Sequence, residues 1–68
     1  MSSITGGLLC RALERHGWKL LRVNGSHHVY GKDNLSFRIS VPVHSGKPLK
    51  RGMLMHILKL VGLDEGDI

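Results

Sequence analysis

The sequence predicts an α+β fold in which a helix, a three-stranded antiparallel sheet and a second helix follow one another (α-β-β-β-α). Three observations indicate it: apolar residues at helical spacing near each end, strict apolar–polar alternation in LSFRISV, and an Asn-Gly turn between two strand-like runs. Both helices should pack on the one dry face of the sheet. At 68 residues, we expect a single domain over 1–68 with a thin core and little room for an enclosed cavity.

The first helix is predicted over residues 8–16, where leucine and alanine recur one helical turn apart. Thr5 can cap its start, and Gly17 can take the left-handed conformation beyond its end. Gly6 and Gly7 precede this segment and should weaken its first turn by up to about 1 kcal/mol each relative to alanine.

Three strands are predicted over residues 18–24, 26–31 and 35–41. Asn24-Gly25 is a favoured two-residue turn for a hairpin between the first two. In the third, apolar residues occupy every second position, which predicts one buried and one solvated face. The sheet is therefore expected to be an antiparallel meander.

A basic loop, VHSGKPLK, leads to a second helix predicted over residues 51–61. Its apolar stripe points to one side, and Gly62 is placed to end it. The members of the stripe are Leu54, Ile57, Leu58 and Val61.

Cys10 is the single cysteine, so no internal disulfide can form and a reducing compartment is favoured. No stretch approaches the roughly 20 apolar residues of a membrane helix, and MSSITGG lacks the features of a signal peptide. We therefore expect a cytosolic protein with no membrane association. Trp18 and Phe37 are expected to fill the core and not to serve as a base-stacking platform. Cys10 is expected to be a small core or flank residue, not a nucleophile.

The charge balance points to a polyanionic partner. The sequence contains ten lysines and arginines and five acidic residues, which gives a formal net charge of +5 and a pI near 10.0. Nucleic acid is the commonest polyanion that so basic a domain meets, and an acidic protein is the next. Both can apply, with one partner competing with the other.

The cations concentrate where the second helix begins. Lys47, Lys50 and Arg51 surround its N-terminus, and free backbone N–H groups with the helix dipole make such a place suitable for phosphate. Arg22 and Arg38 can extend this patch over the exposed face of the sheet. The alternative is a charged loop that only keeps the protein soluble.

A family resemblance rests on three stretches and on their order: GSHH after the first strand, VPVH after the third and the ending LKRGMLMHILKLVGL. From about residue 8 to 63 the chain resembles the HicA family of bacterial messenger-RNA-cleaving toxins. The resemblance implies a double-stranded-RNA-binding-like fold, a place in a type II toxin–antitoxin system of the bacterial cytoplasm, and neutralisation by a HicB-type antitoxin protein.

On the GSHH match, the histidine that the family needs for toxicity falls on His27, with Gly25, Ser26 and His28 as its motif neighbours. An imidazole can give or take a proton near neutral pH. Because RNA supplies its own nucleophile, the 2′-hydroxyl, one placed acid or base can promote strand scission without metal. The expected products carry a cyclic phosphate and a 5′-hydroxyl.

The alternative without a functional role is that both histidines are ordinary polar residues on a strand. Side chains alternate along a strand, so His27 shares a face with Val29, and His28 shares the other face with Tyr30. If Val29 is buried, His27 also points inward, and the pattern alone then selects His28 as the exposed histidine. We favour His27, because the first residue after a tight turn often lies at the rim of a sheet. There it would look into a groove beside a helix.

A second proton-transfer group is less evident. His44 in VPVHSGK is the first candidate and Tyr30 the second, with a solvated loop residue as the alternative for His44. His16 and His56 lie in predicted helices and should be solvated or capping side chains. The histidines and the one cysteine are too irregularly spaced for zinc, so no metal or other cofactor is expected.

These observations favour a metal-independent endoribonuclease that cleaves messenger RNA. The main alternative is a non-catalytic double-stranded-RNA-binding module with the same fold and patch, whose activity would not need His27. A third possibility is a small interaction domain that binds an acidic protein and never RNA, which predicts no salt-dependent binding of RNA.

Overall fold

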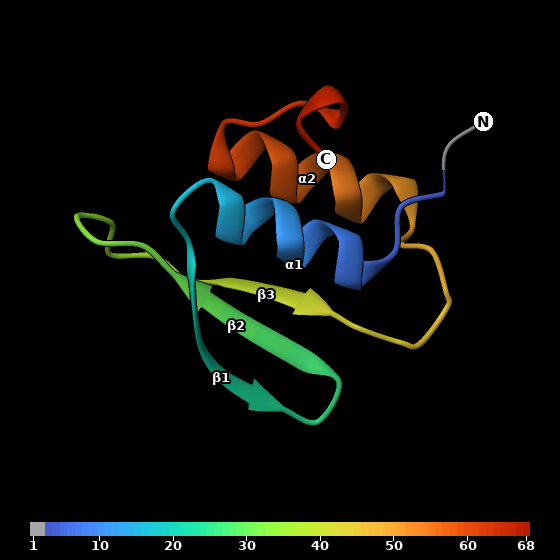
Figure 1. The fold of residues 1–68 in the computed structure, drawn as a ribbon, viewed down its shortest axis with the longest axis horizontal. Coiled ribbons are helices and arrows are strands. Elements are labelled where there is room, and N and C mark those ends of the chain that lie inside the picture. The colour runs from blue at the N-terminus through green and yellow to red at the C-terminus, as the bar shows by residue number, and fades with distance from the viewer. Residues whose placement is uncertain (1–2) are drawn as a thin grey trace.

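The computed structural model describes residues 3–68 and contains two α-helices on one face of a three-stranded sheet (Figure 1). The strands pair antiparallel in the order β1-β2-β3. The predicted α+β order of helix, three strands and helix is confirmed, and the second face of the sheet stays open. The elements are α1 (Gly6–Arg15), β1 (Lys19–Asn24), β2 (His27–Gly31), β3 (Ile39–Pro42), α2 (Arg51–Val61) and a terminal 3₁₀ helix η1 (Glu65–Asp67).

Both ends of α1 follow the predicted capping. The hydroxyl of Thr5 accepts a hydrogen bond from the amide of Leu8 at 3.2 Å, which satisfies one free donor of the first turn. Gly17 takes a φ of 93° just after the helix, where a residue with a side chain would be disfavoured. The helix begins at Gly6, two residues before the predicted start.

At Gly6 the backbone of α1 comes into close contact with the end of β3. A Cβ at this position would collide with the carbonyl oxygen of Pro42 and lie 3.1 Å from the Cα of Val43. A Cβ on the next residue, Gly7, would meet only the hydroxyl of Thr5 at 3.9 Å. The sequence showed Gly6 only as a weak helix former, whereas its missing side chain lets α1 pack directly on the end of β3.

The loop between β3 and α2, residues 43–50 and called the basic loop below, is attached to the N-terminal segment at both ends. Its first residue, Val43, lies under Gly6, and near its other end the amide of Leu49 donates to the carbonyl of Ile4 at 2.8 Å. Thr5 and Pro48 form a bridge beside that bond. Residues 4–6 therefore hold the basic loop in place.

The hairpin turn differs by one residue from the prediction. Asn24 pairs with His27, so the two loop residues are Gly25 and Ser26, and the assignment of the turn to Asn24-Gly25 is wrong. Gly25 has a φ of 63°. A positive φ at the first of two loop positions alone is typical of a type II′ turn, which glycine satisfies while the asparagine stays in the ladder.

A β-bulge in β1 changes the direction of one cationic side chain. Leu20 pairs with Tyr30, but the next pair is Arg22 with Val29, so Leu21 is the extra residue. Without the bulge, alternation would place Arg22 on the same face as Leu20, which is the face of the buried Tyr30. The bulge turns Arg22 to the open face.

The third strand is shorter than predicted. Residues 35–38 are not in the ladder: β2 ends at Gly31, and the chain turns directly afterwards, with the amide of Leu35 bonded to the carbonyl of Lys32 at 3.1 Å. Phe37 is consequently 39% exposed, and its assignment to the core is wrong. It packs at a tilt against Trp18, with ring centroids 5.8 Å apart, and Trp18 itself is buried as predicted.

The core lies between the helices and the inner face of the sheet. Tyr30 is 1% exposed, and its hydroxyl donates to a carboxylate oxygen of Glu14 on α1 at 2.6 Å. Burial, and secondly this hydrogen bond, raise the pKa of Tyr30. Cys10 is buried as predicted, and burial raises the pKa of its thiol. The largest fully buried side chains are Tyr30, Leu9, Leu13, Leu58 and Val41.

Gly6→Ala and Gly7→Ala should have opposite effects on stability. Both raise helix propensity, but the added methyl at Gly6 meets backbone, so Gly6→Ala should lower the free energy of unfolding by about 1–3 kcal/mol. Gly7→Ala should raise it by up to about 1 kcal/mol. Urea denaturation of both variants measures this, and equal effects of the two would contradict the close contact.

Tyr30→Phe should change how stability depends on pH. In the unfolded chain the phenol of Tyr30 ionises near pH 10, whereas in the folded protein it keeps its proton. The stability that the buried phenol contributes is therefore fully present below about pH 10 and is lost as the pH rises above it. Tyr30→Phe should cost about 1 kcal/mol at pH 7 through the lost hydrogen bond to Glu14. Above pH 10 it should lose stability less steeply than the wild type, as denaturation across pH 7–11 would show. Cys10, whose raised pKa acts in the same direction, is present in both proteins. Equal slopes in the two would contradict the prediction.

Candidate nucleic-acid interface

His27 lies on the open face of the sheet. Tyr30 is buried under the helices, so His28 shares that inner face, whereas His27 and Val29 point to the opposite side. His27 is exposed, and the premise that Val29 faces the core is wrong. His27 is the first residue of β2, at the rim as expected, but it faces the open side of the sheet and not a groove beside a helix.

Ser40 of β3 is the nearest polar neighbour of this imidazole. Its hydroxyl lies 3.3 Å from Nδ1 of His27. Ile39 and Val41 are buried on either side of Ser40, so Ser40 must face the open side too. The contact restrains the ring and leaves Nε2, on its far side, without a protein partner in residues 3–68. The sequence showed that Ser40 was solvated but not that it reaches His27.

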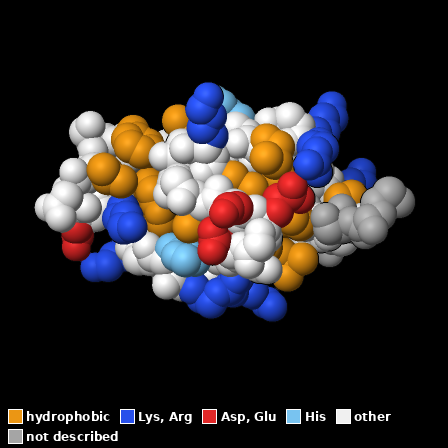
Figure 2. All heavy atoms as spheres, turned by 90° about the horizontal axis from the view of Figure 1, so that it is seen from above, with side chains coloured by type: hydrophobic (Ala, Val, Ile, Leu, Met, Phe, Trp, Pro, Cys, Tyr) orange, Lys and Arg blue, Asp and Glu red, His pale blue; other side chains and the backbone are white. Residues whose placement is uncertain are grey.

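Two arginines share the face of His27. Arg22 is turned there by the bulge, and Cδ of Arg38 lies 3.3 Å from where a Cβ of Gly31 would be, on the same side of the strand. No aspartate or glutamate occurs in the three strands. Figure 2, which views the molecule from the side of α2, shows a group of acidic side chains near the middle of that side. The open face is therefore electropositive.

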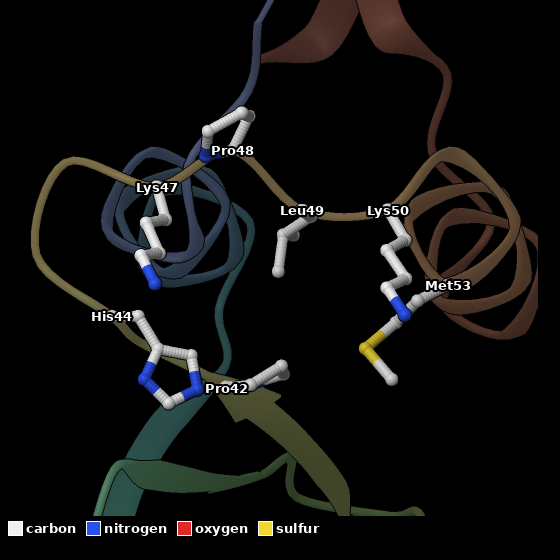
Figure 3. Close-up of a pocket in the computed structure, with 7 residues that line it drawn as sticks. All are labelled: Pro42, His44, Lys47, Pro48, Leu49, Lys50 and Met53. Carbon is white, nitrogen blue, oxygen red and sulfur yellow. The ribbon is translucent and has the colours of Figure 1, made fainter.

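A cavity of about 340 Å³, called the loop cavity below, opens between the end of β3, the basic loop and the first turn of α2 (Figure 3). Its walls are largely apolar: Pro42, Pro48, Leu49 and Met53. Pro42 is also the strand partner of His27. The cavity and the exposed imidazole thus belong to one end of the sheet, an adjacency that depends on the fold and leaves no sign in the sequence.

The rim of the loop cavity is formed by His44, Lys47 and Lys50. The amide of Lys47 donates to the carbonyl of His44 at 2.9 Å, which closes the turn that presents both side chains. In Figure 3 the side chain of Lys47 points toward the imidazole of His44, and Lys50 ends beside Met53. Within residues 3–68, the cavity has no acidic side chain in its lining.

The backbone donors at the start of α2 have no side-chain cap. Lys50 is the N-cap of α2, and its side chain makes no capping hydrogen bond. The amide of Leu54 donates a hydrogen bond to the carbonyl of Lys50 at 3.0 Å. The first turn contains no acidic residue that could compete with an anion for its free amides. Arg51 does not line the cavity, because its guanidinium pairs with Glu65 at 3.0 Å.

The remaining candidates lie elsewhere. Tyr30 cannot transfer a proton on the open face, because it is buried on the other face and its hydroxyl is bound to Glu14. His16 and His56 are exposed on the helix side of the chain, as expected for solvated residues. Among residues 3–68, no three histidine, cysteine or acidic side chains are grouped to hold a metal ion.

Fold and site together define a small basic α+β protein with an exposed histidine and cations on an open sheet face. The family model described as "HicA toxin of bacterial toxin-antitoxin" matches residues 8–63, which is most of the chain. The chain belongs to the HicA toxin family of bacterial toxin–antitoxin systems. No curated protein matches its sequence. In the described part of the chain, no helix has the length and apolar character needed to cross a membrane.

Proposed function

We propose that this member of the HicA toxin family is a metal-independent endoribonuclease that cleaves messenger RNA in the bacterial cytoplasm, with His27 as general acid or base. The observation that supports it most is the position of His27: an exposed imidazole on an electropositive, open face, restrained by Ser40. A substrate as large as RNA can lie across such a face, and no enclosed pocket around the reacting atoms is required.

The reaction needs only proton transfers around the phosphate. The 2′-oxygen of the ribose forms a bond to phosphorus as it loses its proton to a base, and the bond from phosphorus to the 5′-oxygen breaks as that oxygen gains a proton. His27 performs one of these transfers through Nε2, while the Ser40 contact at Nδ1 holds the ring. A 2′,3′-cyclic phosphate and a 5′-hydroxyl result.

We assign the complementary proton transfer to His44. It lies two residues beyond Pro42, the strand partner of His27, so both imidazoles are at the same end of the sheet. Lys47 and Lys50, on the same rim, would stabilise the negative charge that builds up on the phosphate oxygens.

The RNA backbone would follow the cations of the cavity rim and then those of the open face. Lys47 and Lys50 hold phosphate at the start of α2, and Arg22 and Arg38 extend the track along the sheet. Arg51, ion-paired with Glu65, contributes less than the sequence pattern suggested. A HicB-type antitoxin, acidic where it covers His27, would block the same face.

His27→Ala should lower RNA cleavage by about 10²–10⁴-fold, because a positioned acid or base contributes rate of that order. The measurement uses a defined single-stranded RNA with chelator present and identifies the product ends. His28→Ala, on the inner face, is the matched control and should keep its activity once shown to be folded.

Cleavage that survives in His27→Ala and is lost in His28→Ala would overturn the assignment. Salt-dependent RNA binding by the wild type with no cleavage would indicate the non-catalytic binding module. Cleavage that stops in chelator would refute a metal-independent reaction.

Replacing both Lys47 and Lys50 by alanine should flatten the salt dependence of RNA binding. Each neutralised phosphate contributes about −0.7 to the slope of log affinity against log salt for single strands, so the slope should become less negative by about 1.4. Binding is measured in the His27→Ala background to prevent cleavage. Arg11→Ala with Lys59→Ala, two exposed helix cations outside the loop cavity, is a control of equal charge. An equal change of slope in both double variants would show that Lys47 and Lys50 are not part of the surface that binds RNA.

A further inference from the structure

We infer that the loop cavity is a nucleobase-binding subsite that holds one base next to the scissile phosphate and sets the preference for the cleavage site. The inference rests on the proposed function, since the base belongs to the RNA strand that lies at His27. Three properties of the loop cavity favour a base: its chemistry, its position next to His27 and its rigidity.

The chemistry of the loop cavity fits a base attached to phosphate. Its walls are flat or flexible apolar groups, the rings of Pro42 and Pro48 and the thioether of Met53, while its charge is confined to Lys47 and Lys50 at the rim. A nucleobase has apolar faces and a polar edge, and it is attached to an anionic backbone. Its faces match the apolar walls of the cavity, and its edge and the phosphate match the charged rim. The volume of about 340 Å³ is in the range of small-ligand sites.

His44 adds an aromatic surface to this cavity. Bases of single-stranded RNA are commonly bound by stacking on aromatic side chains, histidine among them. The imidazole of His44 lies on the rim, where Figure 3 shows it between Lys47 and Pro42. It can therefore pack against a base that enters the cavity while it remains near the phosphate at its mouth.

The position of the cavity ties it to His27. Pro42 faces His27 across the ladder, and the amide of Val43 donates to the carbonyl of Ser26 at 2.7 Å, which fixes the start of the basic loop to the turn before His27. One residue of the cavity wall is thus the direct neighbour of the imidazole. A base in the cavity belongs to a nucleotide at, or next to, the phosphate that His27 reaches.

The cavity is held open by backbone contacts. Gly6 packs against Pro42 and Val43, and Leu49 is hydrogen-bonded to Ile4 at 2.8 Å. A preformed site discriminates between bases without first ordering a loop. The donors at its rim are ammonium groups, so we expect guanine, with its adjacent O6 and N7 acceptors, to be preferred over bases with an amino group at that edge.

Met53→Glu and Met55→Glu form a matched pair to test the subsite. Both methionines are on α2 with similar exposure, 44% and 42%, but only Met53 lines the cavity. Binding is measured with 2′-O-methylated, uncleavable oligoribonucleotides that carry guanine, adenine, cytosine, uracil or an abasic site at each position in turn. Both variants change the net charge equally, so a difference between them reports on the cavity.

In the wild type, one position should lose about ten-fold in affinity when it is abasic and should favour guanine. Met53→Glu should abolish this dependence on the base, and Met55→Glu should preserve it within about two-fold. Equal behaviour of the two variants, or no sensitivity to any abasic site in a wild type that still cleaves RNA, would overturn the subsite alone. A wild type that neither binds nor cleaves RNA would overturn the subsite and the proposed nuclease together.

Discussion

The contact between the backbone of Gly6 and the carbonyl of Pro42 determines how the rest of the site is arranged. It brings the first turn of α1 onto the end of β3, which no residue with a Cβ would permit. From there the chain can run back through Thr5 and Ile4 to bind the far end of the basic loop. A helix start that carries none of the proposed chemistry thereby positions His44 and both rim lysines beside the strand partner of His27.

The sequence was most informative where one signal dominated. The apolar stripe of α2 and the left-handed Gly62 gave its bounds as Arg51–Val61. It was less informative where tertiary pairing decided the outcome. Alternation in LSFRISV continues through residues 35–38, yet the chain turns at residues 32–35, so residues 35–37 lie beyond the end of β2. The bulge at Leu21 has no local signal either, because it is defined by the register between two strands.

The same distinction applies to the histidines. Period-two alternation correctly separated His27 from His28, but it could not tell which face the helices cover, because both Val29 and Tyr30 are plausible inward residues. Tyr30 is the buried one since Glu14, on a different element, accepts its hydroxyl hydrogen bond. A buried phenol needs such a partner, and the partner is visible only once the helix is packed on the sheet.

β1 has a consequence for self-association. All six of its residues are exposed, apolar ones among them, and its outer edge has no partner strand in the described chain. Lys19, Arg22 and the bulge at Leu21 are what discourage a second copy from adding to it, since charge and irregularity disfavour edge-to-edge pairing. Neutralising Arg22 alone would leave Lys19 and the bulge at Leu21 in place, so the edge of β1 would still resist pairing with a second copy.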